Sequence, residues 1–105
     1  MIRIKVGKKQ GSYVSFESRG HADYAEEGSD IVCSAVSALI ITTFNSLEKL
    51  TKEPCKPKDK DGLVTAAFTQ PNTAEGRLLM DSLLLGLTEI EKEYPKYLKV
   101  MIREV

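Results

Sequence analysis

The side chains with the clearest capacity for covalent chemistry are Cys33 and His21, the only histidine of the chain. A cysteine thiolate is a strong nucleophile, and an imidazole can take the thiol proton and return it to a leaving group. Ser29 or Asp30 can cap a helix, which places Cys33 in the predicted first turn of that helix. The dipole and unpaired amides of a helix start favour a thiolate and could hold the oxyanion of a tetrahedral intermediate. The pair is therefore a candidate centre for nucleophilic attack on a carbonyl.

A third residue could orient the imidazole. Asp30 could do this or could merely cap the helix, and Asp23 is another candidate. The cysteine and the histidine also fit roles without chemistry. Free cysteines are commonly buried and inert, and a lone histidine after a strand is most often a surface or capping residue. The second cysteine, Cys55, lies outside any predicted helix start, so we expect it to be structural or exposed.

Composition argues against several other classes of function. Two cysteines without a C-x-x-C pattern and one histidine do not suit a zinc site, so we expect no metal and no cofactor. Basic and acidic residues number 15 each, so net charge gives no drive toward nucleic acid, and no direct nucleic-acid partner is expected. A local lysine cluster is interpreted as a solvated turn, with a ribosome or RNA contact as the alternative: Lys52, Lys56, Lys58 and Lys60.

The sequence also predicts the compartment. No apolar run approaches the roughly 20 residues that cross a bilayer. Residues 1–6 alternate apolar and basic side chains, whereas an export signal needs a continuous apolar stretch. We therefore expect a cytoplasmic protein without a membrane partner.

Hydrophobic periodicity predicts the elements that position these residues. Strands are predicted at residues 2–6, 12–19, 63–69 and 97–105, with a weaker strand from about residue 55. One helix is predicted from residue 29 or 30 to Pro54, and another from its cap, Asn72, to about residue 94. Residues 20–28, framed by Gly20 and Gly28, fit neither period and are predicted to form a loop, of a kind that is often functional or mobile.

This order of elements, ββαββαβ, predicts an α+β two-layer sandwich in one domain over residues 1–105, with two helices on a five-stranded, mostly antiparallel sheet. Residues 31–41 are apolar on nearly every side, which predicts that this half of the first helix is buried. The second helix carries more leucine than packing on one sheet requires. That surplus favours a helix-mediated homodimer over simple packing of one helix on the other.

One long motif resembles the signature of the ribosomal-processing cysteine protease family called Prp. The family pattern is a G-H-A triplet followed by G-x-D-I-V-C-[AS]-A-V-S. This chain has Gly20-His21-Ala22, followed by Gly28-Ser29-Asp30-Ile31-Val32-Cys33-Ser34-Ala35-Val36-Ser37. Ser34 stands where alanine is frequent in the family. The resemblance extends over the whole chain, in its length and in the order of its elements.

The resemblance implies a bacterial, cytoplasmic, homodimeric hydrolase of the thiol protease type that acts in ribosome biogenesis. Such proteases remove an N-terminal extension from the precursor of the large-subunit ribosomal protein L-twenty-seven, and they cut behind a hydrophobic, phenylalanine-containing motif. The family's nucleophile falls on Cys33, its histidine on His21 and its motif aspartate on Asp30. The expected substrate-binding residues are those of the loop and the oxyanion region, namely Gly20, Ala22, Gly28, Ser29 and Ser34.

In this hypothesis the loop moves aside for the peptide, so His21 and Cys33 could lie too far apart for a hydrogen bond without substrate. Two other interpretations stay open. One is a non-enzymatic ribosome-associated binding module in which Cys33 only packs. The other is a thiol-based redox or acyl-transfer protein, although a resolving C-x-x-C partner is missing. The available apolar candidates for a specificity groove are Leu39, Phe44, Phe68 and Met80.

Overall fold

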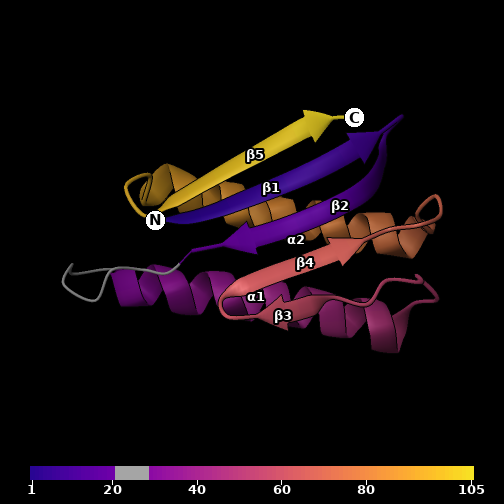
Figure 1. The fold of residues 1–105 in the computed structure, drawn as a ribbon, viewed down its shortest axis with the longest axis horizontal. Coiled ribbons are helices and arrows are strands. Elements are labelled where there is room, and N and C mark those ends of the chain that lie inside the picture. Colours follow the sequence, from indigo (N-terminus) through magenta and orange to yellow (C-terminus); the bar gives the residue numbers. More distant parts are fainter. Residues whose placement is uncertain (21–28) are drawn as a thin grey trace.

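The computed structural model of the chain describes residues 1–20 and 29–105. The described part has five strands and two helices, in the predicted order (Figure 1): β1 (Ile2–Lys9), β2 (Ser12–Arg19), α1 (Ser29–Leu50), β3 (Lys58–Lys60), β4 (Leu63–Ala67), α2 (Ala74–Glu93) and β5 (Leu98–Glu104). Except for Gly20, the segment predicted as a loop lies outside the described residues. The α+β prediction is confirmed.

The five strands form one sheet in the order β3-β4-β2-β1-β5. The β1–β2, β2–β4 and β3–β4 pairs are antiparallel, as predicted for most of the sheet. β1 and β5 are parallel, with Ile2 opposite Leu98, so the sheet is mixed. Figure 1 shows the reason: α2 carries the chain back to the end of the sheet at which β1 begins, so β5 starts beside the start of β1 and runs in the same direction.

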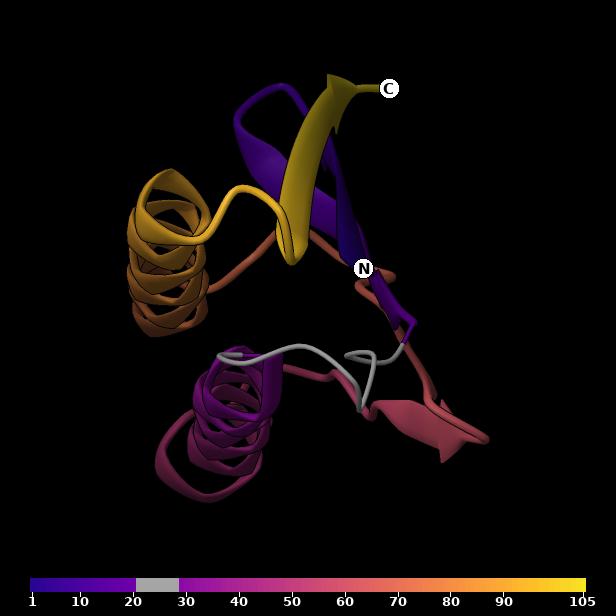
Figure 2. The ribbon, with the colours of Figure 1, turned by 90° about the vertical axis from the view of Figure 1, so that its left-hand side faces the viewer.

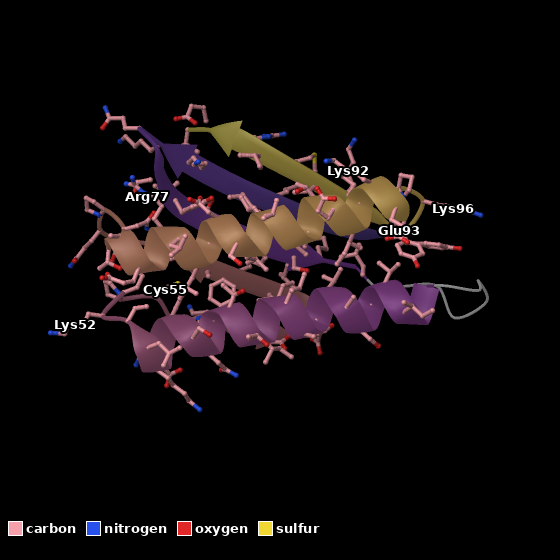
Figure 3. All side chains as sticks on the ribbon, turned by 180° about the vertical axis from the view of Figure 1, so that it is seen from behind. Lys52, Cys55, Arg77, Lys92, Glu93 and Lys96 are labelled. Atoms are coloured by element: carbon pink, nitrogen blue, oxygen red, sulfur yellow. The ribbon has the colours of Figure 1, made fainter. Side chains whose placement is uncertain are left out.

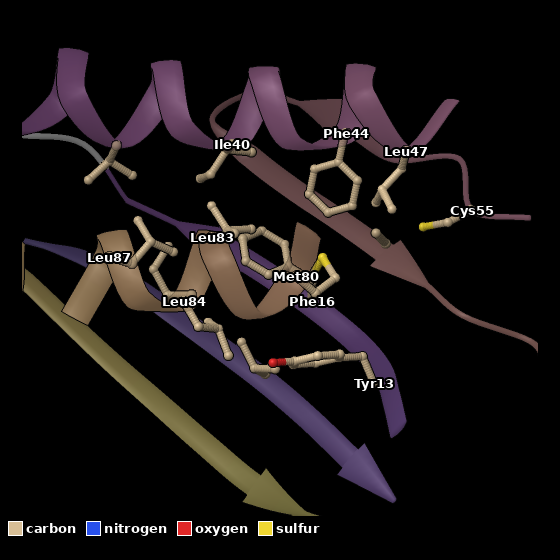
Figure 4. Packing of buried hydrophobic residues seen from close by; sticks show 14 of the residues in the cluster. Tyr13, Phe16, Ile40, Phe44, Leu47, Cys55, Met80, Leu83, Leu84 and Leu87 are labelled. Carbon is tan, nitrogen blue, oxygen red and sulfur yellow. The ribbon is translucent and has the colours of Figure 1, made fainter. Parts of the chain in front are cut away.

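Both helices cover the same face of the sheet, and no helix of the described residues covers the other face (Figure 2). Strand alternation places Ile2, Ile4 and Val6 of β1 in the core between the layers, while Arg3 and Lys5 are exposed. The core is closed by residues from both helices and the sheet (Figure 4). Among them the rings of Phe16 and Phe44 pack edge to face with centroids 5.3 Å apart.

The predicted apolar stripe of α1 is confirmed, because Val32, Val36 and Ile40 are buried. The helix is not buried on all sides, however. In the single chain Ile31 is 63% exposed and Ile41 is 59% exposed, so the prediction of all-round burial is wrong at these two positions. One helix lies against one sheet and one neighbouring helix, and that leaves part of its circumference uncovered.

Contrary to the expectation from the sequence, one stretch is long and apolar enough to cross a membrane by length and composition. It runs from Ile31 to Leu50, with a mean hydropathy of 1.5. Core helices pass the same test. α1 buries one apolar stripe, which includes Val36 and Ile40, in the core, and 33% of the apolar window is buried in the single chain.

Two local predictions need correction. β1 continues to Lys9, so the turn to β2 is confined to Gln10 and Gly11, whose positive φ angles of 51° and 80° are those that a two-residue hairpin turn demands. The N-cap of α2 is Thr73 and not Asn72. The Asn72 side chain is used elsewhere: its Oδ1 accepts a hydrogen bond from the Tyr13 amide at 2.6 Å, and its Nδ2 donates to the Tyr13 carbonyl at 3.2 Å.

A buried carboxylate ties the segment after α1 to the start of α2. Glu53 is only 5% exposed, and its Oε1 accepts hydrogen bonds from the Thr73 amide at 2.8 Å and from the Thr73 hydroxyl at 3.2 Å. The Thr73 Oγ1 in turn accepts from the Gly76 amide at 3.0 Å. Negative charge at this position also suits the positive end of the helix dipole. A side chain at Gly76 would overlap Glu53 Oε1, so glycine is needed there for steric reasons.

Candidate active site

Cys33 is half-buried and packs against the hydrophobic core from α1. Because α1 begins at Ser29, Cys33 is its fifth residue and starts the second turn, one position beyond the predicted first turn. The amides that lack an acceptor within a helix belong to its first turn. Any backbone donors to an oxyanion from α1 would therefore come from the turn that precedes Cys33.

Cys33 lines a small pocket of about 170 Å³ at the end of the sheet where β1 starts and β2 ends. Its volume is below the roughly 300 Å³ at which small-molecule sites begin, and it suits a single side chain better. The lining comes from α1, from β1 and β2, and from the β3–β4 hairpin: Ile2, Ser18, Gly20, Cys33, Val36, Ser37, Ile40, Ile41, Asp59, Gly62 and Val64. Cys33 thus lies at a concave surface that is lined by both apolar and polar side chains.

Two backbone features build the walls of this pocket. The β3–β4 hairpin turns at Asp61 and Gly62, with φ angles of 52° and 80°, and this tight turn brings its residues beside α1. Gly20 has a φ of 106°, and a side chain there would overlap the carbonyl oxygen of Met1. Gly20 is the residue immediately before His21, so the close contact with Met1 determines where the chain leaves the sheet.

The structure brings together two of the residues predicted for the site, Gly20 and Cys33, in the lining of one pocket. Ser34 is exposed on α1 and is not among the residues of that lining. The remaining predicted site residues lie outside the described positions, either entirely or in their side chains: His21, Ala22, Gly28, Ser29 and Asp30. Catalytic roles for His21 and Asp30 stay predictions.

Sequence reasoning missed Ser37, Asp59 and Val64 in the pocket lining. Ser37 follows Cys33 by four residues, and that helical spacing could have identified it. The other two belong to the β3–β4 hairpin and carry no local signal of proximity to α1.

The proposed groove residues have other positions. Phe44, Phe68 and Met80 are buried in the core, and Leu39 packs close to Gly86 of α2. None of them lines the pocket at Cys33, and Phe68 lines a separate hollow together with Ser12 and Arg77.

Cys55 is 6% exposed. It belongs to the cluster of buried residues in Figure 4. Of the two predictions for Cys55, a structural or an exposed residue, the structural one is confirmed. Burial, and secondarily the nearby Glu53 carboxylate, raise the pKa of the Cys55 thiol to about 11. Within the described residues no group of three or more histidine, cysteine, aspartate or glutamate side chains could hold a metal ion.

The two thiols should differ strongly in their rate of alkylation. At pH 8 only roughly one Cys55 thiol in a thousand is ionised, given its pKa of about 11, and the core shields it from reagent. Cys33 is half-buried on a pocket wall. We expect iodoacetamide to modify Cys33 at least about 10-fold faster than Cys55, as measured by peptide mass spectrometry. In urea the two alkylation rates should become similar. A difference in rate that persists in urea would show that the fold is not the reason for it.

Comparison with known proteins places this arrangement in a family. Residues 1–99 match the family described as cysteine protease Prp. Similar chains include the ribosomal processing cysteine protease Prp of Staphylococcus aureus, 32% identical over 83 residues that cover 77% of this chain and 78% of the relative. Another is the protein of the same name from Bacillus subtilis, 33% identical over 93 residues that cover 83% of each chain.

Solved structures agree. The S. aureus ribosomal processing protease Prp, in complex with a covalently linked product peptide, is 28% identical, with a TM-score of 0.89 over 98% of this chain and 100% of that one. The same protease with a substrate peptide is 26% identical, with a TM-score of 0.90 and the same coverage. SMU.848 from Streptococcus mutans is 29% identical, with a TM-score of 0.85 over 100% of this chain and 96% of that one.

Proposed function

Because this chain belongs to the Prp family of cysteine proteases, we propose that it is the endopeptidase that removes the N-terminal extension of the large-subunit ribosomal protein L-twenty-seven. The observation that carries the proposal is the position of Cys33. It lines a pocket to which Gly20, the residue that leads directly to His21, also belongs. A nucleophile beside a pocket for one apolar side chain is what cleavage next to a hydrophobic residue requires.

The chemistry proceeds through an acyl-enzyme. His21 accepts the thiol proton, and the Cys33 sulfur attacks the scissile carbonyl carbon. Backbone amides of the first turn of α1 stabilise the oxyanion. His21 then protonates the leaving amine, which is the new N-terminus of the ribosomal protein. Water hydrolyses the thioester and restores the thiol. Asp30 orients the imidazole or caps the helix.

The specificity follows from the pocket. Val36, Ile40 and Val64 give it an apolar lining, and we assign to it a side chain of the hydrophobic, phenylalanine-containing motif behind which the cut is made. Residues on either side of the nucleophile would hold the peptide backbone: Gly20, Ala22, Gly28, Ser29 and Ser34. Support comes from the S. aureus relative, whose complexes hold a substrate peptide and a covalently linked product peptide.

Cytoplasmic location and a homodimer belong to the same proposal. Large apolar side chains that the single chain leaves exposed occur on both helices: Ile31, Ile41, Leu78 and Leu85. Pairing of two helix layers would remove them from water, which is favourable in proportion to the apolar area covered. The proposed assembly is one protease domain in each subunit.

A synthetic peptide that spans the extension and the first residues of mature L-twenty-seven tests the substrate. We expect a single cut behind the phenylalanine-containing motif, located by mass spectrometry. Replacing the phenylalanine with alanine should lower kcat/KM by roughly 10- to 100-fold, since burial of such a side chain contributes about 1.5–3 kcal/mol. A peptide altered only after the cut serves as the control. Cleavage at several unrelated positions, or equal cleavage of the alanine peptide, would refute this specificity.

A further inference from the structure

The fold separates charges that balance over the chain as a whole. The five strands together contain nine lysines and arginines but only three acidic residues. The two helices contain seven acidic residues but only three basic ones. Because both helices cover the same face (Figure 2), the positive charge is concentrated in the sheet layer.

Strand alternation directs most of these cations away from the helices. Arg3 lies opposite Arg19 and Lys99 on the neighbouring strands, so these three side chains share the outer face. Lys58 lies opposite Thr65, which in turn lies opposite the outward-facing Glu17, so Lys58 belongs to the same face. We define the basic sheet face by its seven exposed cations: Arg3, Lys5, Arg19, Lys58, Lys60, Lys99 and Arg103. Among strand residues of the same alternation, Glu17 is the one carboxylate.

The cations of this face repel one another. Arg3 lies directly opposite Arg19 on β2 and directly opposite Lys99 on β5, so three cations form a row on neighbouring strands about 4.8 Å apart. Like charges in such positions destabilise a sheet. Within the described residues, the ion pair of this face is Arg19 with Glu17 at 3.8 Å, and both groups are partly in water. The other six cations of the face have no ion pair among the described residues, as expected for a surface that meets an anion.

The same face has a hollow at which two of its cations lie beside hydroxyl groups. Gly7 interrupts the side chains of β1, and a hollow of about 330 Å³ opens around it. Lys5 and Arg103 lie at this hollow together with the hydroxyl residues Ser15 and Thr65, and its lining also holds the Glu17 carboxylate and apolar residues such as Val105. Arginine, lysine and hydroxyl side chains are the usual donors to phosphate oxygens.

The side chains of the basic sheet face indicate which kind of polyanion it can bind. Its outward strand residues include no aromatic side chain, so it lacks both the stacking platform for single-stranded bases and the aromatic anchors of many protein interfaces. Its large outward apolar residues are Leu63 and Met101, both half-buried, so it offers few apolar groups for insertion into a membrane surface. What it offers is phosphate contacts over a broad face, which is how double-stranded RNA is bound without regard to sequence.

We propose that the basic sheet face binds double-stranded RNA through its phosphates. The expectation of no nucleic-acid partner rested on net charge, which does not register how the fold separates the charges. Cys33 lies on α1, on the helix side, so RNA on the sheet face would leave the thiol accessible. The proposal stands on the charge arrangement and does not depend on the identity of the cleaved substrate.

Binding of the intact protein to a 20-base-pair RNA duplex, measured by fluorescence anisotropy, tests this. If about four phosphates are neutralised, Kd should weaken on the order of 100-fold between 50 and 200 mM salt. The triple substitution Arg3→Gln, Lys5→Gln and Lys99→Gln should weaken binding at least about 10-fold at 50 mM salt and flatten the salt dependence. Circular dichroism verifies that the variant is folded.

The matched control is Lys49→Gln, Lys52→Gln and Lys92→Gln, which changes net charge equally outside the sheet (Figure 3 labels Lys52 and Lys92 on the helix side). Its Kd should stay within about twofold of the unsubstituted protein. Equal weakening in both triples would overturn the proposal. So would equally tight binding of polyglutamate, or of phosphatidylserine vesicles. Peptide cleavage by both triples should be unchanged, so failure of RNA binding and failure of the protease proposal give separate results.

Discussion

Replacing Cys33 with alanine is expected to abolish cleavage of the precursor peptide, with a loss in kcat of at least about 1,000-fold. The substitution removes the atom that forms the acyl-enzyme, and the backbone amides that remain cannot replace it. Because Cys33 is only half-buried on a helix, alanine in its place should leave the fold intact. Single-turnover kinetics with the peptide measures the loss, and thermal unfolding verifies the fold.

His21→Ala should give a loss of roughly 100- to 10,000-fold, the range for removal of a general base. Cys55→Ser is the control for a thiol outside the site, since Cys55 lies in the core. It should keep most of the specific activity of its folded fraction. Cleavage by Cys33→Ala at the unsubstituted rate would exclude Cys33 as the nucleophile, and full activity of His21→Ala would exclude the histidine as the base.

Gly76→Ala should destabilise the protein, against the usual effect of this change inside a helix. In most helices this change stabilises by about 0.5–1 kcal/mol. Here the new methyl group would overlap Glu53 Oε1, which holds the Thr73 amide and hydroxyl. Displacing a buried carboxylate from two hydrogen bonds should lower the free energy of unfolding by about 2–3 kcal/mol, or Tm by roughly 10 °C. Urea and thermal unfolding of the purified protein measure both quantities.

A double-mutant cycle isolates this cause. In a Glu53→Ala background the obstructing oxygen is absent, so adding Gly76→Ala should be neutral or slightly stabilising. The sign of the Gly76→Ala effect would therefore depend on residue 53. Equal destabilisation in the two backgrounds would show that the overlap with Glu53 is not the reason for glycine at this position.

Local patterns were sufficient for most of the elements and for the family. Period-two alternation predicted β1, β2 and β5, and the stripe through Val32, Val36 and Ile40 predicted α1, because these residues face one core whatever their partners are. The motif around Cys33 identified the family that the comparisons confirm.

The predictions were wrong or incomplete where contacts between residues far apart in the sequence determine the structure. Asparagine is a residue type that often caps helices, but the Asn72 side chain forms hydrogen bonds with the backbone of Tyr13. Thr73 caps the helix instead. Asp59 and Val64 reach the pocket only because of the β3–β4 hairpin. The concentration of cations on the sheet depends on strand register, which neither composition nor net charge contains.

The parallel pairing of β1 with β5 has a consequence for how the molecule is made. Ile2 meets Leu98, so the first strand completes its pairing only after almost the entire described chain is available. Closing such a long loop is entropically unfavourable, and sheets built on distant contacts fold slowly. During translation β1 would therefore wait with one edge unpaired until β5 leaves the ribosome, exposed to association with other nascent strands. The sheet is therefore completed only after synthesis, and the same holds for the part of the Cys33 pocket that β1 lines.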